Sequence, residues 1–146
     1  MKTSEQGIRI IKKYEHLSLT AYKDEEGEWV IGYGHRTGVS RGDKTNETGA
    51  TEMLKEDLLM AEKTVSALKM ELTQEQFDAL VSLVQGIGVS CFRKYWVQPL
   101  KADSRSGAIY DLFTRWCMKT DAETGEKVKD ERLLERRKEE AELYYS

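Results

Sequence analysis

The chain of 146 residues contains little cysteine, a single proline and no long hydrophobic run. Its two cysteines, Cys91 and Cys117, show no metal-ligand spacing and are too few for a disulfide framework, so free thiols are expected. No apolar stretch approaches the length of a membrane-spanning helix, and the N-terminal residues lack the apolar core of a signal peptide. These absences predict a protein that is not inserted in a membrane and is kept in the cytoplasm after synthesis.

Charged residues of both signs are abundant instead. They make up 34% of the chain, hydrophobic residues make up 39%, and the net charge is −3. This balance is typical of one globular domain with a buried core. No basic stripe is interleaved with aromatic residues, which argues against nucleic acid as a partner. A monomer without metal or cofactor is expected.

The periodicity of hydrophobic residues predicts a mainly helical chain. Thr3 and Gln6 have the spacing of a capping box, which predicts a first helix that ends near His16. A helical stripe runs over residues 53–68, and a second capping box at Thr73–Gln76 opens the next helix. The remaining segments are expected to be a short helical piece at 92–100 interrupted by Pro99, a helix at 108–118, a loop or small hairpin at 119–129, and a charged helix at about 130–144.

The most informative segment lies between Glu15 and His35. Two short extended runs flank the turn Asp24–Gly27, whose glycine suits a left-handed backbone position. One carboxylate therefore lies at a helix end and another lies in a hairpin turn. Glycoside hydrolysis needs such a pair, with one carboxyl group as general acid and the other across the cleft.

This segment resembles the active-site segment of phage-type lysozymes, the endolysin muramidases. The family pattern is Glu, eight residues, Asp or Cys, five residues, Thr, and then Ile-Gly-x-Gly-His. Glu15 and Asp24 match the first two positions, whereas Val30 stands where the family has threonine. Residues 72–82, 113–116 and 135–144 resemble later family segments in the same order.

The resemblance implies a fold and a cellular setting. The expected fold is α+β and mainly helical, a single two-lobed lysozyme-like domain over residues 1–146. Its N-terminal lobe would span about 14–48, and its helical lobe about 49–146 together with the first helix. A phage or prophage protein of this kind would remain in the bacterial host's cytoplasm until its release to the cell wall, or would be carried in the virion.

The resemblance also implies cleavage of the β-1,4 bond between N-acetylmuramic acid and N-acetylglucosamine in bacterial peptidoglycan. Glu15 would be the general acid, and Asp24 would stabilise the positive charge and help orient water. In the family the threonine hydroxyl holds that water, and Val30 has no hydroxyl. Three outcomes follow: a weaker hydrolase, a lytic transglycosylase that closes a 1,6-anhydro ring, or a glycan-binding or virion protein that does not cut.

Several other residues receive roles from the resemblance. His35 is expected to pair with Asp57 as a structural ion pair rather than to act in catalysis. Tyr33 and Val30 are candidate substrate contacts. Gln85 is a third, because Gly86 replaces the family's cleft-floor asparagine and its neighbour could take over the polar role.

The terminal helix supplies the last candidates. Arg132 occupies the place of the usual glycine and could reach toward Glu15, so it is a candidate substrate-site residue. Arg136 and Arg137 are expected to pack within the helix and to lie at the surface.

Overall fold

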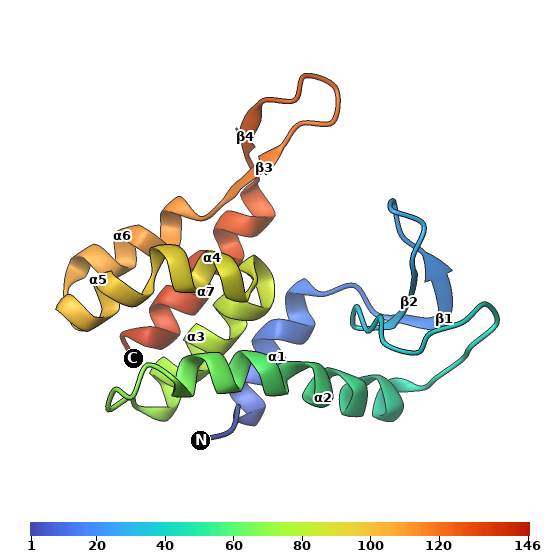
Figure 1. Ribbon diagram of the computed structural model, residues 1–146, viewed down its shortest axis with the longest axis horizontal. Coiled ribbons are helices and arrows are strands. Elements are labelled where there is room, and N and C mark those ends of the chain that lie inside the picture. Colours follow the sequence, from blue (N-terminus) through green and yellow to red (C-terminus); the bar gives the residue numbers. More distant parts are fainter.

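The computed structural model describes residues 1–146, and it contains seven helices and two small antiparallel hairpins (Figure 1). The helices are α1 (Glu5–Tyr14), α2 (Glu47–Ser66), α3 (Gln74–Ile87), α4 (Val89–Tyr95), α5 (Val97–Ala102), α6 (Gly107–Arg115) and α7 (Glu131–Tyr144). The strands are β1 (Ser18–Lys23), β2 (Trp29–Gly32), β3 (Met118–Thr120) and β4 (Lys127–Lys129). The expected mainly helical α+β fold is confirmed.

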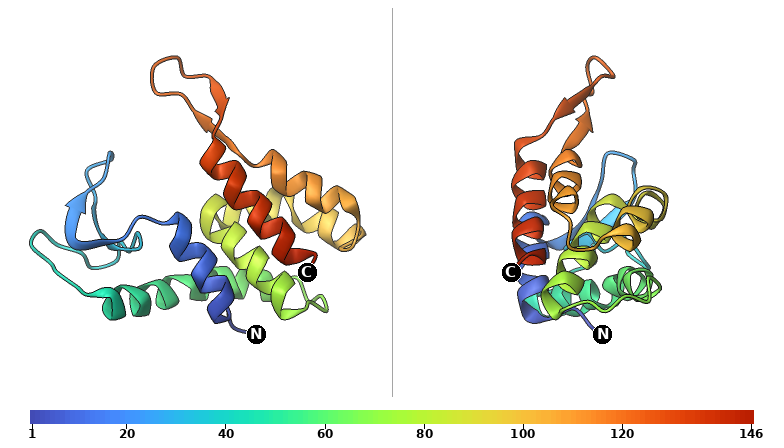
Figure 2. Two further views of the ribbon diagram at one scale, coloured as in Figure 1. Left: turned by 180° about the vertical axis from the view of Figure 1, so that it is seen from behind. Right: turned by 90° about the vertical axis from the view of Figure 1, so that its left-hand side faces the viewer.

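Helix α3 lies at the centre of the helical lobe. It packs against α1, α2 and α7, and α7 in turn packs against α6 (Figure 2). The apolar side of α3 buries Phe77, Leu80 and Leu83, which join Trp96 and Phe113 in one continuous core. The end of α1 is thereby fixed beside α3 and α7.

The N-terminal lobe consists of the β1–β2 hairpin and the loop that follows it. Tyr22 pairs with Val30 across the two strands, and Gly27 in the turn has φ 82°, as its left-handed position requires. The loop returns to the hairpin through an isolated bridge between Thr20 and Lys44. Helix α2 then connects this lobe to the helical lobe (Figure 1).

The start of α1 differs from the expected capping box. Ser4 is the N-cap but its side chain makes no cap hydrogen bond. Instead, its amide and hydroxyl both donate to Asp78 on α3, and Thr3 donates to Glu62 on α2. Partners from distant helices therefore replace the local cap, and the prediction for Thr3 and Gln6 is wrong. The capping box of Thr73 and Gln76 at α3 is confirmed.

Pro99 does not interrupt a helix. It is the third residue of α5, where a backbone N–H would have no acceptor within the helix in any case. The segment expected to be a loop or a small hairpin is a hairpin over residues 118–129, with Thr120 opposite Lys127 and Lys119 opposite Val128. This β3–β4 hairpin projects from the helical lobe (Figure 1). Both cysteines are free thiols.

None of the helices combines the length and the apolar character that crossing a bilayer requires.

Candidate active site

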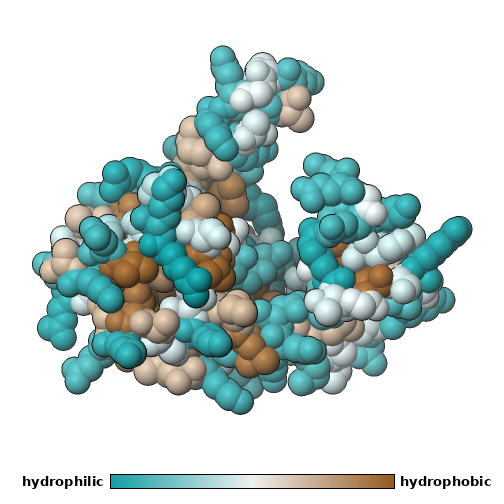
Figure 3. All heavy atoms as spheres, in the orientation of Figure 1, coloured by the Kyte–Doolittle hydropathy of each residue, from teal (hydrophilic) through white to brown (hydrophobic).

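Glu15 lies at the junction of the two lobes. It is the C-cap of α1, with an extended backbone, and its amide donates to Ile11 O at 3.0 Å. Figure 3 shows a hollow between the helical lobe and the N-terminal lobe, bordered mainly by hydrophilic residues, and the end of α1 faces it (Figure 1). The Glu15 side chain keeps 25% of its surface exposed, so substrate in the hollow could reach it.

A buried arginine holds one oxygen of this carboxylate. Arg136 on α7 donates from Nη1 to Glu15 Oε1 at 3.0 Å and from Nη2 to Gln85 Oε1 at 2.8 Å. Its Nε donates to Glu140 Oε2 at 3.2 Å. Arg137 also donates to Glu140, which is fully buried. These bonds join the C-terminal ends of α1 and α3 to the middle of α7.

The second oxygen of Glu15 has no hydrogen-bond partner within the chain. Oε2 lies near Gly34, where a β-carbon would be 3.9 Å away. Gly34 has φ 90°, a backbone conformation that glycine adopts without strain. The carboxyl group is therefore oriented through Oε1 while Oε2 remains available to a ligand.

Asp24 lies in the β1–β2 turn and accepts hydrogen bonds on both oxygens. Its Oδ1 accepts from the amides of Glu26 and Glu28, each at 2.9 Å, and its Oδ2 accepts from Arg36. The Arg36 guanidinium, followed by these amides, lowers the pKa of Asp24. Asp24 is thus held as an anion, the state in which a carboxylate can stabilise positive charge or orient water.

Replacing Arg36 by glutamine is expected to raise the pKa of Asp24 toward its ordinary value of 3.8, because the largest cause of the depression is removed. A depressed carboxyl pKa contributes stability that is present above the unfolded value and lost as pH falls through the folded one. The variant should therefore lose less stability than the wild type on acidification below 3.8. Carbon-13 NMR titration of the Asp24 carboxyl group would measure the shift.

Arg41→Gln is the matched control, since Arg41 is an exposed arginine of the same loop that forms no ion pair in the structure. An Asp24 pKa that is equal in the Arg36→Gln variant and the wild type would contradict this account of the turn.

The other residues predicted from sequence are placed as follows. Val30 and Tyr33 are buried, with 1% and 7% of their surfaces exposed, so each side chain offers little surface for direct contact with a sugar. Gln85 is linked to Glu15 by Arg136, which donates a hydrogen bond to each of them. His35 Nδ1 lies 2.9 Å from Asp57 Oδ2, linking the N-terminal lobe to α2.

Two expectations for the terminal helix need correction. Arg132 does not reach Glu15: its Nη2 donates to Lys13 O at 2.9 Å, and its guanidinium lies over the Tyr14 ring. Arg136, one turn further along α7, makes the Glu15 contact. Arg136 and Arg137 are also not surface residues, because the shared carboxylate of Glu140 allows both cations to be buried.

Sequence reasoning missed Arg36 and Glu140. Arg136 and Glu140 have i,i+4 spacing on one helix, a signal for an ion pair that is present in the sequence. Arg36 follows the Gly-His element and faces the acidic turn, but only the fold of the loop brings it to Asp24.

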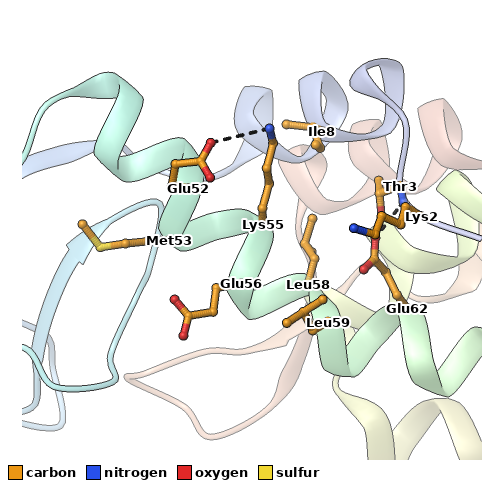
Figure 4. Close-up of a pocket in the computed structure, with 10 residues that line it drawn as sticks. All are labelled: Lys2, Thr3, Ile8, Glu52, Met53, Lys55, Glu56, Leu58, Leu59 and Glu62. Carbon is orange, nitrogen blue, oxygen red and sulfur yellow. Dashed lines mark hydrogen bonds and ion pairs between the residues drawn. The ribbon is translucent and has the colours of Figure 1, made fainter.

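A separate cavity of about 610 Å³ lies between α2 and the N-terminal segment (Figure 4), and Glu15 is not among its lining residues. Its lining includes Glu52, Glu56 and Glu62. Glu62 accepts a hydrogen bond from the Thr3 hydroxyl, and Glu52 Oε1 lies 3.7 Å from Lys55 Nζ. No three His, Cys, Asp or Glu side chains converge in a way that could hold a metal ion. Glu15 at the junction of the lobes and Asp24 in the β1–β2 turn therefore remain the better candidates for chemistry.

Comparison with known proteins identifies the family of this chain. Residues 12–140 match the family model described as phage lysozyme. The chain is 34% identical to an endolysin of Acyrthosiphon pisum secondary endosymbiont phage 1, over 100% of this chain and 99% of that protein. An endolysin of Salmonella phage P22 is 35% identical over 80% of this chain and 84% of its own length.

Solved structures give the same result. The muramidase domain of SpmX from Asticaccaulis excentricus superposes with a TM-score of 0.91 at 31% identity, covering 99% of this chain and 98% of that one. A point mutant of P22 lysozyme superposes with a TM-score of 0.82 at 34% identity, covering 100% of this chain and 99% of that one. The chain therefore belongs to the phage lysozyme family.

Proposed function

We propose that this chain hydrolyses the β-1,4 bond between N-acetylmuramic acid and N-acetylglucosamine, with Glu15 as general acid and Asp24 as the second carboxylate. Membership of the phage lysozyme family makes it a peptidoglycan-cleaving muramidase, a glycoside hydrolase. The assignment of roles to individual residues is supported by the geometry of the two carboxyl groups.

The observation that carries the assignment is the different surroundings of Glu15 and Asp24. Glu15 has one oxygen held by Arg136 and one that no group of the chain occupies. Asp24 has both oxygens bonded, and its pKa is lowered by Arg36. In glycosidases, different environments give two carboxyl groups different roles, one as the proton donor and the other as the anion.

The chemistry follows from these positions. Protonated Glu15 would donate from Oε2 to the glycosidic oxygen, so that the bond to C1 of muramic acid breaks and the alcohol departs. The Asp24 anion would stabilise the oxocarbenium-like charge that develops on the sugar. A water molecule then adds to C1, and the proton that it loses restores the acid form of the site. These steps call for no metal or cofactor.

The experiment is digestion of purified sacculi. The wild-type protein should release soluble glycan fragments with time, whereas protein unfolded by heat should release none. A folded wild-type protein that releases no fragments from accessible sacculi would overturn the proposed activity.

Replacing Val30 by threonine tests the missing hydroxyl. Loss of one oriented hydrogen bond in a transition state commonly lowers the rate by a factor of about 100 or more. We therefore expect Val30→Thr to raise kcat on peptidoglycan about tenfold or more, since part of that contact is restored. Because Val30 is 1% exposed, the variant is also expected to lose about 1 kcal/mol of stability through burial of a hydroxyl.

Val30→Ala is the control, because it removes methyl groups without adding a hydroxyl. An unchanged kcat in a folded Val30→Thr variant would mean that another group positions the water.

The partner and location follow from the same proposal. The substrate is the peptidoglycan of the bacterial wall, and we propose that the protein acts as a monomer. We also propose that the protein stays in the host cytoplasm until it is released to the wall.

A further inference from the structure

Arg36 contacts two carboxylates of the β1–β2 hairpin at once. Its Nη1 donates to Asp24 Oδ2 and lies 3.4 Å from Glu28 Oε2. Arg36 and Glu28 are open to solvent, with 51% and 63% of their side chains exposed, whereas the Asp24 side chain is 17% exposed. One guanidinium nitrogen therefore lies between the proposed second carboxylate and another acceptor at the surface.

The two oxygens of Asp24 have different partners. Oδ1 accepts from the amides of Glu26 and Glu28, each at 2.9 Å, so it holds the backbone of the turn. Oδ2 accepts from Arg36 alone. Oδ2 can therefore change its partner without disturbing the turn, and it is the oxygen that the proposed chemistry has to use.

Asp24 does not need Arg36 in order to be an anion at neutral pH. The guanidinium lowers the pKa of Asp24, but the ordinary value of 3.8 is already low enough for ionisation. The contact opposes catalysis instead, because a carboxylate and a guanidinium together carry no net charge. An oxocarbenium-like charge is stabilised less by this pair than by the carboxylate alone. The arginine also occupies the oxygen to which a water molecule would donate.

Glu28 offers a second place for the guanidinium. Its side chain has no hydrogen-bond or ion-pair partner other than Arg36, and its Oε2 already lies 3.4 Å from Arg36 Nη1. Moving Arg36 from Asp24 to Glu28 replaces one exposed ion pair by another. Because such pairs contribute little net free energy, a ligand that binds near Asp24 can shift Arg36 from one carboxylate to the other.

We propose that Arg36 is an autoinhibitory latch on Asp24, and that Glu28 is the positioning residue that takes up its guanidinium when a glycan strand enters the site. This inference rests on the proposed function, because it describes how the second carboxylate becomes available. The exchange moves one cation between two anions, and no covalent bond forms or breaks. Binding of the strand then includes the release of Oδ2, so a closed latch lowers the apparent affinity.

Three variants test the latch: Arg36→Gln, Glu28→Gln and the double variant. We expect Arg36→Gln to raise kcat/KM on sacculi about threefold, since an exposed ion pair no longer has to be broken. Glu28→Gln should lower kcat/KM about threefold, because the released guanidinium loses its acceptor. In the Arg36→Gln background, Glu28→Gln should have no effect, so the double variant should equal Arg36→Gln.

Arg41→Gln and Glu25→Gln are the matched controls. Each makes the same change of charge on an exposed side chain of the N-terminal lobe that forms no ion pair. Both should leave kcat/KM close to the wild-type value. A kcat/KM of Arg36→Gln at or below that of the wild type would overturn the latch, and so would an equal effect of Glu28→Gln with and without Arg36. An equal rise in Arg41→Gln would trace the effect to net charge and would also overturn it.

Calorimetry separates the latch from the proposed function. The probe is a soluble tetrasaccharide of alternating N-acetylglucosamine and N-acetylmuramic acid, and the Glu15→Gln background prevents its cleavage. Adding Arg36→Gln should lower the Kd of this probe about threefold, and adding Glu28→Gln should raise it about threefold. Equal Kd values for the three proteins, or no binding by any of them, would overturn the latch. A wild-type protein that digests no sacculi would instead reject the proposed function.

Discussion

Replacement of Glu15 by glutamine is expected to lower the rate of peptidoglycan cleavage about a thousandfold, within the range attributed to general acid catalysis. Glutamine keeps the size of the side chain and can still accept from Arg136 Nη1, but it has no proton to give to the glycosidic oxygen. Release of dye from labelled sacculi would measure the rate, and thermal unfolding would show that the fold is retained.

Glu25→Gln is the control for this variant. Glu25 is an exposed carboxylate in the turn beside Asp24, and its side chain has no partner in the structure. Its replacement should leave the rate within about twofold of the wild type, as a surface change does. Equal rates for Glu15→Gln and the wild type would remove Glu15 from the chemistry.

Replacement of Arg136 by methionine is expected to destabilise the fold by about 3–5 kcal/mol, the cost of breaking a buried ion pair by removing one partner. The Arg136 side chain is 5% exposed, and it bonds to Glu15 at the end of α1, to Gln85 on α3 and to Glu140 on its own helix, α7. Without it, Glu140 is left buried with one arginine fewer. In a domain of this size the melting temperature should fall by about 10 °C.

Arg132→Met provides the comparison on the same face of α7. Arg132 is exposed, and its guanidinium contacts only Lys13 O and the Tyr14 ring. Its loss should cost less than about 1 kcal/mol, as for other surface arginines. If chemical denaturation gave Arg136→Met and Arg132→Met the same stability, the buried cluster would not hold the three helices together.

The fold of this chain follows largely from local patterns. The capping box of Thr73 and Gln76, the glycine in the β1–β2 turn and the stripe of α2 each specify an element through residues close in sequence. The start of α1 is not specified by residues close in sequence, because Ser4 and Thr3 use acceptors on α3 and α2 that lie 74 and 59 residues away. Distant partners of this kind leave no local signal.

The site shows the same division. The spacing of Glu15 and Asp24 predicts both carboxylates, but it does not predict which arginine contacts Glu15. Arg132 and Arg136 are one turn apart on α7, so the choice between them depends on where that helix passes the end of α1. Arg137 Nη2 occupies the space that a side chain at position 86 would need, and this arrangement likewise depends on the packing between α3 and α7.

The most direct test of the central claim is identification of the new sugar ends in a digest of purified peptidoglycan by mass spectrometry. The wild-type protein should produce reducing N-acetylmuramic acid ends, and Glu15→Gln should produce almost none. Anhydromuramic acid ends would instead show a transglycosylase, which needs Glu15 but no water positioned by residue 30. Equal numbers of reducing ends from the wild type and Glu15→Gln would contradict hydrolysis by this pair of carboxylates.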